Sequence, residues 1–142
     1  MSVVVTIAEA VVAELNASGL LGGATAGRHY RATFDLRDMK DLHVTVVPKG
    51  KDFQGASRSM VQEDVQIDVG VQRKLATSDQ AEIDGLMGLV EQLADWLRGR
   101  QLTGAPDAVW VRTENVPVYS PEHLEQLRQF TSVLTLTYRV LR

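Results

Sequence analysis

The sequence predicts an α+β domain, with a mostly antiparallel sheet of about five strands and two main helices packed on one face. Two segments repeat apolar residues at helical spacing, several others alternate apolar and polar residues, and links rich in glycine or proline separate them. The predicted order is helix, three strands, helix, two strands. Antiparallel pairing with both helices on one face is the natural packing for that order.

Length and composition are those of one folded domain, predicted to cover 1–142. The chain has 142 residues, of which 44% are hydrophobic, enough for a core. Its formal net charge of -3 argues against a dedicated nucleic-acid binder, which usually carries a strong basic excess. No apolar run approaches the ~20 residues that span a bilayer, and no secretory signal is evident. We therefore expect a soluble protein made in the cytoplasm.

Both helices are predicted from apolar residues spaced three and four apart. The first is expected to start at Thr6, which has the spacing of a capping box with Glu9. The second is expected to start at Ser78 as its cap and to end at Gly99 or Gly104. Each large aliphatic side chain that this second helix buries contributes ~1.5–3 kcal/mol, enough to fix it on a sheet.

Strands are predicted at 30–36, 42–47, 61–73, 108–113 and 128–141. A flexible glycine-rich link at 19–27 precedes the first strand, and a hairpin loop at 37–41 joins the first two. The clearest strand is Val61–Arg73, which is apolar at odd positions and polar at even ones, apart from Glu63 and Gly70. A period of two over this length requires a strand with one buried face, spanning roughly 40 Å at ~3.3 Å per residue.

The segment 48–59, PKGKDFQGASRS, is predicted to be a flexible extended loop, because proline and glycine interrupt both strands and helices. It carries three basic residues and a lone aromatic, namely Lys49, Lys51, Arg58 and Phe53. Such residues can neutralise phosphates and stack on bases. A protein-contacting arm explains them as well or better, because an exposed Phe is often ordered only by a partner.

No set of residues in the sequence resembles a catalytic centre, and we predict no metal site and no cofactor. Cysteine is absent, which excludes thiolate ligands and cysteine nucleophiles. His43 lies beside Asp41 and could be combined with Ser57 or Ser59 as a hydrolase triad. Nothing flanks either serine like a nucleophile elbow, so a surface histidine and a polar loop are favoured.

Two tryptophans are open to two interpretations. Trp96 lies off the apolar stripe of the second helix, and Trp110 lies between Val109 and Val111, on the opposite face of its strand. Either could complete the core of its own chain. Either could instead enter a neighbouring subunit, because tryptophan is enriched at interface hot spots.

Three stretches carry a resemblance to a known family. They are the loop PKGKDFQGASRS, the strand VQEDVQIDVGVQRK and the ending FTSVLTLTYRVLR. Together with the order of elements, they resemble the tail terminator (tail completion) family of long-tailed bacteriophages. The resemblance covers roughly Thr6 to Leu141 and lies in element order and sequence texture, not in a diagnostic motif.

The resemblance implies a structural virion protein at the head–tail junction, without enzymatic residues. It implies a homohexameric ring that caps the tail tube, with the tail tube protein on one side and the head–tail connector or stopper protein on the other. DNA would be present only in transit through the lumen, and no membrane is involved. The loop residues Lys49, Lys51, Phe53, Gln54 and Arg58 would then be subunit or partner contacts. The strand residues Gln62, Asp64, Gln66 and Asp68 would form a possible lumen face.

Other functions remain open on the sequence. A small-ligand-binding or weak hydrolase α+β domain could be built around His43 and the segment 48–59, and it requires a deep pocket lined by converging polar groups. Within the structural class, a head–tail stopper or adaptor, or a tail-tube-like protein, has a similar sequence texture.

Overall fold

The computed structural model describes residues 2–30, 41–76, 80–116, 118–126 and 128–142, and within them five strands form one mixed sheet. The strands are β1 (Ala26–Arg28), β2 (His43–Gly55), β3 (Val61–Lys74), β4 (Val109–Glu114) and β5 (Gln129–Leu141), and the helices are α1 (Val3–Ala17), α2 (Gln80–Leu97) and α3 (Pro121–Gln126). The order across the sheet is β1-β2-β3-β5-β4, with β1 parallel to β2 and the other neighbours antiparallel. The predicted α+β fold is confirmed.

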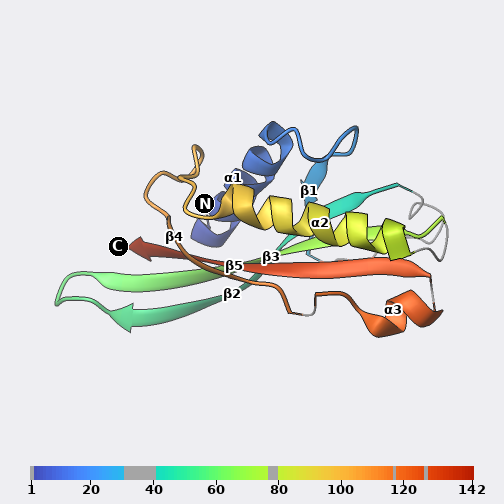
Figure 1. The fold of residues 1–142 in the computed structure, drawn as a ribbon. Helices are drawn as coiled ribbons and strands as arrows, with labels where there is room; N and C mark the ends of the chain where they lie inside the picture. The colour runs from blue at the N-terminus through green and yellow to red at the C-terminus, as the bar shows by residue number, and fades with distance from the viewer. Residues whose placement is uncertain (1, 31–40, 77–79, 117, 127) are drawn as a thin grey trace.

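The two long helices cover the same face of the sheet (Figure 1). The stripe Ile7, Val11 and Leu15 of α1 and the stripe Leu86, Val90, Leu93 and Leu97 of α2 join the core with the odd residues of β3, which are Val65, Ile67, Val69 and Val71. We call this side of the sheet the covered face and the other side the open face. The alternation of β3 therefore exists because both long helices cover the same face of the sheet.

The short helix α3 contacts one end of β5 on the open face. Thr131 lies opposite Gln72, on the polar side of β3, and its Oγ1 is 2.8 Å from Nδ1 of His123 in α3. Ser120 caps this helix with a contact of 3.4 Å from the backbone N–H of His123 to Ser120 Oγ. The predicted helical turn is thus present and extends to Gln126.

The first helix starts earlier than the sequence predicts. It begins at Val3 with Ser2 in the capping position, and the Thr6 hydroxyl donates a hydrogen bond of 3.0 Å to the backbone carbonyl of Ser2. Thr6 therefore lies inside the helix and does not cap it. The apolar residues that precede Thr6 pack against the core, and this burial outweighs the local capping signal.

The glycine-rich link contains a short strand that the sequence did not predict. Asn16 fixes β1 to α1, because its side chain donates to the carbonyl of Ala26 and accepts from the Ala26 N–H at 2.7 Å. Most of the strand predicted at 30–36 and most of the hairpin loop at 37–41 lie outside the described residues, as does Ser78. Gly99, at φ +68, ends α2 as predicted.

The prediction of a loop over 48–59 is wrong for its first part. β2 continues to Gly55 and pairs with β3 in register, so only the connection 56–60 lies between the two strands. The register shifts between Pro48 and Gly50, which is a bulge. Proline and glycine are tolerated at a bulge and on a strand edge that has no neighbour.

Candidate assembly surfaces

The outer end of the β2–β3 hairpin, residues 49–61, forms an arm, and the tip of this arm extends past the end of β5 (Figure 1). All of its side chains from 51 to 60 are exposed. Lys51 is held in place, with its Nζ 3.7 Å from a Glu63 carboxylate oxygen and 5.1 Å from the ring centroid of Phe53. Phe53 remains 58% exposed. The arm is therefore an extended strand that presents an uncovered aromatic ring.

The turn at the tip of the arm is closed by its own hydrogen bonds. The N–H groups of Ala56 and Ser57 donate to the carbonyl of Met60 at 3.1 and 3.2 Å, and the Met60 N–H donates to Ser57 Oγ at 3.2 Å. Ser57 is therefore a turn-forming residue. Arg58 is carried at the exposed tip of this turn.

The residues predicted as partner contacts fall on two different faces of the arm. Lys51 and Phe53 are opposite Val65 and Glu63, so their side chains lie on the covered face, whereas Gln54 is opposite Gln62 on the open face. Lys49 lies at the bulge, with its Nζ 4.0 Å from Asp68. A partner that contacts Phe53 therefore approaches from the side of the helices.

The outer edge of β2 is paired only near its start. β1 covers Val44 to Val46, where the His29 N–H also donates to the Val46 carbonyl at 2.9 Å. Beyond Val46, no described strand lies beside β2 on that edge. The N–H and C=O groups of alternate residues in the arm point outward, as in any edge strand. This edge is available for the addition of another strand.

The predicted lumen-face residues form a half-buried, largely neutralised row on the open face. Arg139 binds the Asp64 carboxylate through two nitrogens, at 2.9 and 3.2 Å, and Thr135 Oγ1 donates to Asp68 at 2.7 Å. The hydrogen bond from Arg139 lowers the pKa of Asp64. Because Arg139 of β5 pairs with Asp64 and Lys49 of β2 lies 4.0 Å from Asp68, this face carries less negative charge than the β3 sequence alone suggests.

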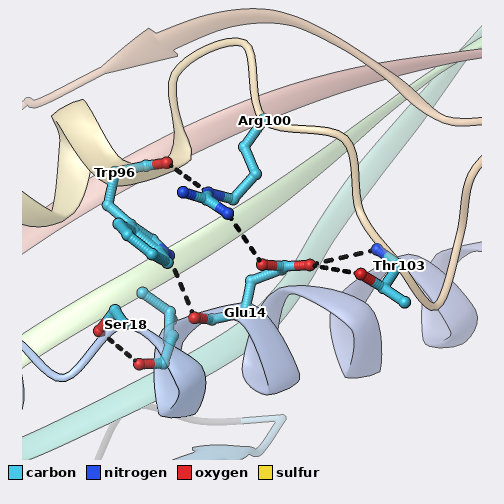
Figure 2. Close-up of polar contacts among 6 residues, drawn as sticks. Glu14, Ser18, Trp96, Arg100 and Thr103 are labelled. Carbon is cyan, nitrogen blue, oxygen red and sulfur yellow. Dashed lines mark hydrogen bonds and ion pairs between the residues drawn. The ribbon is translucent and has the colours of Figure 1, made fainter.

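Trp96 is engaged within its own chain, in a network of α1, α2 and the following loop (Figure 2). Its Nε1 donates to the Glu14 carbonyl at 3.1 Å, and the Arg100 guanidinium stacks 3.5 Å from its ring centroid. The buried Glu14 carboxylate accepts hydrogen bonds from the Thr103 N–H and hydroxyl and lies 3.6 Å from Arg100. Sequence reasoning missed Glu14, although its position beside Leu15 on the apolar stripe was a signal.

Trp110 lies in a groove between α2 and the edge strand β4. Its Nε1 donates to Thr113 Oγ1 at 2.9 Å, and its ring is half-buried. The groove is lined by the apolar residues Val90, Ala94, Trp110 and Leu134 and by the charged residues Glu91, Asp95, Arg98 and Arg112. Glu91 and Asp95 of α2 and Arg98 directly after it are exposed and form the rim of what we call the α2–β4 groove.

The structure does not assemble the hydrolase arrangement considered from the sequence. His43 begins β2 and lines a depression with Asp41 and Arg73, whereas Ser57 and Ser59 lie beyond the other end of the same strand. At ~3.3 Å per residue, the serines are more than about 30 Å from His43. His43 and the segment 48–59 therefore share no pocket.

The described residues contain neither a cluster of metal-ligand side chains nor a membrane-spanning helix. No group of three or more His, Asp or Glu side chains in the described ranges is placed to hold a metal ion. Across the same part of the chain, no helix combines the length and apolar character needed to cross a bilayer.

The fold matches that of a virion protein. No family model and no curated protein matches the sequence. Among solved structures, a chain from the virion of a native gene transfer agent particle superposes with a TM-score of 0.58 at 14% sequence identity. The match covers 96% of this chain and 95% of that chain. The likeness therefore extends over the whole domain and establishes a shared fold.

Proposed function

We propose that this protein is a structural, non-enzymatic component of a phage-like virion, and specifically a tail terminator. It forms a ring, a homohexamer, that caps the tail tube and joins it to the head–tail connector. The observation that carries this proposal is the end-to-end fold match with a chain of a gene transfer agent virion, in which 96% of this chain aligns. The resemblance of the sequence to the tail terminator family points to the same class.

The surfaces of the domain support an assembling role. The arm presents the largely exposed ring of Phe53, and neither the outer edge of β2 beyond Val46 nor the outer edge of β4 has a described strand beside it. Unpaired edges and exposed aromatic rings favour association between chains, and a closed ring would cover them. The tail tube protein and the connector or stopper protein are the other proposed partners.

The open face is the proposed lumen wall. The acids of its β3 row, Asp64 and Asp68, have the cationic partners Arg139 and Lys49, so DNA in transit would meet a polar surface along this row with little net charge. Such a surface does not hold phosphate groups strongly, because tight phosphate binding requires unpaired cations. This is compatible with passage of DNA and with the overall charge of -3.

The proposal is tested by locating the chain in assembled particles. Cryo-electron microscopy of particles should show its density as a ring at the head–tail junction. Loss of the protein should give tail tubes of uncontrolled length that do not join heads, because nothing ends tube growth. Tails of normal length that fail to join heads would indicate a stopper or adaptor. Absence of the chain from the particle would rule out the virion role altogether.

A further inference from the structure

Besides β2, the sheet has a second open edge at β4. β4 is the last strand in the order β1-β2-β3-β5-β4, and no described strand lies beyond it. Val109, Arg112 and Glu114 are opposite Arg139, Thr137 and Thr135 of β5. Arg142 exchanges its backbone hydrogen bonds with Val61 of β3, so the alternating residues Arg139, Thr137 and Thr135 pair toward β4. The backbone groups of Trp110 and Thr113 therefore point away from the sheet.

The outward groups of the arm can be assigned in the same way. Val61 and Arg142 exchange both backbone hydrogen bonds, at 2.8 and 2.9 Å, so Val61 pairs toward β5 and not toward β2. Lys51, Phe53 and Gly55 lie opposite Val65, Glu63 and Val61 of β3, whose backbone groups all pair toward β5. Their N–H and C=O groups consequently point to the free side of β2.

We propose that the arm of one copy of this chain adds as a strand to the β4 edge of a second copy and inserts Phe53 into the α2–β4 groove. The arm and the groove lie on the same side of the sheet. Phe53 and Lys51 project from the covered face of β2, and α2 lies over the covered face beside β4. In a sheet continued from one copy to the next, these two side chains face the groove of the neighbour.

The chemistry of the two surfaces is complementary. The floor of the groove offers Val90, Ala94 and Trp110 to the exposed ring of Phe53. The rim carries Glu91 and Asp95, two exposed acids on α2 that can receive the Lys51 ammonium. An aromatic anchor in an apolar pocket with charges at the rim is the usual anatomy of an interface hot spot.

This contact commits the partner to a second copy in head-to-tail orientation. Each copy contacts one neighbour through its arm and the other neighbour through its β4 edge. Because these two surfaces differ, the interface is heterologous and can close into a ring. A symmetric pairing of two arms would leave the α2–β4 groove empty. The inference deepens the proposed ring-forming function and rests on it, but it concerns a contact that can be tested without the particle.

The test uses single-cysteine variants, since the natural chain has no cysteine. A Lys51→Cys chain, which keeps Phe53, is mixed at high concentration with a differently tagged Ala94→Cys chain, and a short thiol-to-thiol crosslinker is added. We expect a crosslinked heterodimer. The matched control is Asp52→Cys with Ala94→Cys, because Asp52 is the next residue but lies opposite Asp64 on the open face, and this pair should not crosslink.

A second measurement uses sedimentation of the full chain. Phe53→Ala should weaken self-association at least about tenfold, as loss of a hot-spot aromatic does. Tyr30→Ala, which removes another exposed aromatic, should leave self-association unchanged.

Two results would overturn the inference. One is equal crosslinking of the Lys51→Cys and Asp52→Cys variants to Ala94→Cys. The other is no crosslinking either in concentrated solution or in assembled particles. If particles contain the chain but this crosslink does not form, the proposed contact is refuted and the virion role is not. If the crosslink forms but particles lack the chain, the virion role is refuted and the contact is not.

Discussion

The indole Nε1 of Trp96 donates a hydrogen bond of 3.1 Å to the backbone carbonyl of Glu14 and so joins the C-terminal turn of α2 to that of α1. Residues 82 positions apart in the chain meet at this bond. Arg100 stacks on the same indole and also reaches the Glu14 carboxylate. The two helices are therefore fixed to each other as well as to the sheet, which keeps the α2–β4 groove in a constant position.

Trp96→Phe tests this connection. The variant removes the indole donor and leaves the Glu14 carbonyl without it, so we expect the free energy of unfolding to fall by about 1 kcal/mol. Urea denaturation gives the value. Trp110→Phe is the matched control, because the Trp110 Nε1 donates to Thr113 in the same strand, and the loss of stability should be smaller. Equal losses for the two variants would show that the contact between the helices adds nothing.

Two glycines associated with α2 should respond to alanine in opposite directions. Gly99 has φ +68, so Gly99→Ala forces alanine into a left-handed conformation and should lower stability by about 1 kcal/mol. Gly88 lies within α2, and an added Cβ there meets no atom within 4 Å. Gly88→Ala should therefore raise stability by about 0.5–1 kcal/mol. Thermal unfolding of the pair checks both signs, and a stabilised Gly99→Ala would contradict the helix-ending role.

Asp64→Asn should change the dependence of stability on acid. Because Arg139 lowers the pKa of Asp64 in the folded chain, the carboxylate stabilises the fold at pH values above its unfolded pKa of about 4. That contribution is lost as pH falls through the lower, folded pKa. Urea midpoints at neutral pH should therefore favour the natural chain over Asp64→Asn, and the difference should disappear in strong acid. A difference that persists unchanged in strong acid would contradict the role of the Asp64–Arg139 ion pair.

Tyr138→Phe is expected to stabilise the fold. The Tyr138 side chain is fully buried, and its hydroxyl has no hydrogen-bond partner among the residues that the structure describes. Removing a buried, unpaired hydroxyl relieves a desolvation cost, so we expect a gain of about 1 kcal/mol at neutral pH. Tyr138→Ala should instead lose about 3–5 kcal/mol by leaving a cavity. Calorimetry compares the three chains.

The same residue gives a second readout at high pH. Burial raises the pKa of the Tyr138 hydroxyl, so the folded chain keeps its proton while the unfolded chain loses it above about pH 10. The natural chain should therefore lose stability above that pH relative to Tyr138→Phe. A destabilised Tyr138→Phe would mean that the hydroxyl has a bonding partner.

The sequence predicted those elements whose pattern is local. Val65, Ile67, Val69 and Val71 alternate because one face of β3 is buried, and this signal requires no knowledge of distant residues. Glu63 seemed an exception, yet it is buried on the same face under Lys51 and Arg142. A partner 79 positions away accounts for its burial, and the local pattern could not reveal it.

The arm was missed for a similar reason. Pro48 and Gly50 are breakers inside a central strand but are acceptable in an edge strand with a bulge. Whether β2 is an edge there depends on how far β1 extends, which the local sequence does not state. The division of the predicted contact residues between two faces, with Phe53 on one and Gln54 on the other, follows from the same register.

The two neighbours of β3 in the sheet lie at very different distances along the chain, which favours one order of folding. β2 and β3 are joined through 56–60 and can pair early, whereas Gln62 of β3 pairs with Leu141 of β5. Contacts between such distant residues form slowly, because a long loop must close first. During synthesis, the edges of the β2–β3 hairpin therefore remain unpaired until β5 emerges from the ribosome. Refolding yield should accordingly decline as protein concentration rises, since that interval exposes strand edges to other chains.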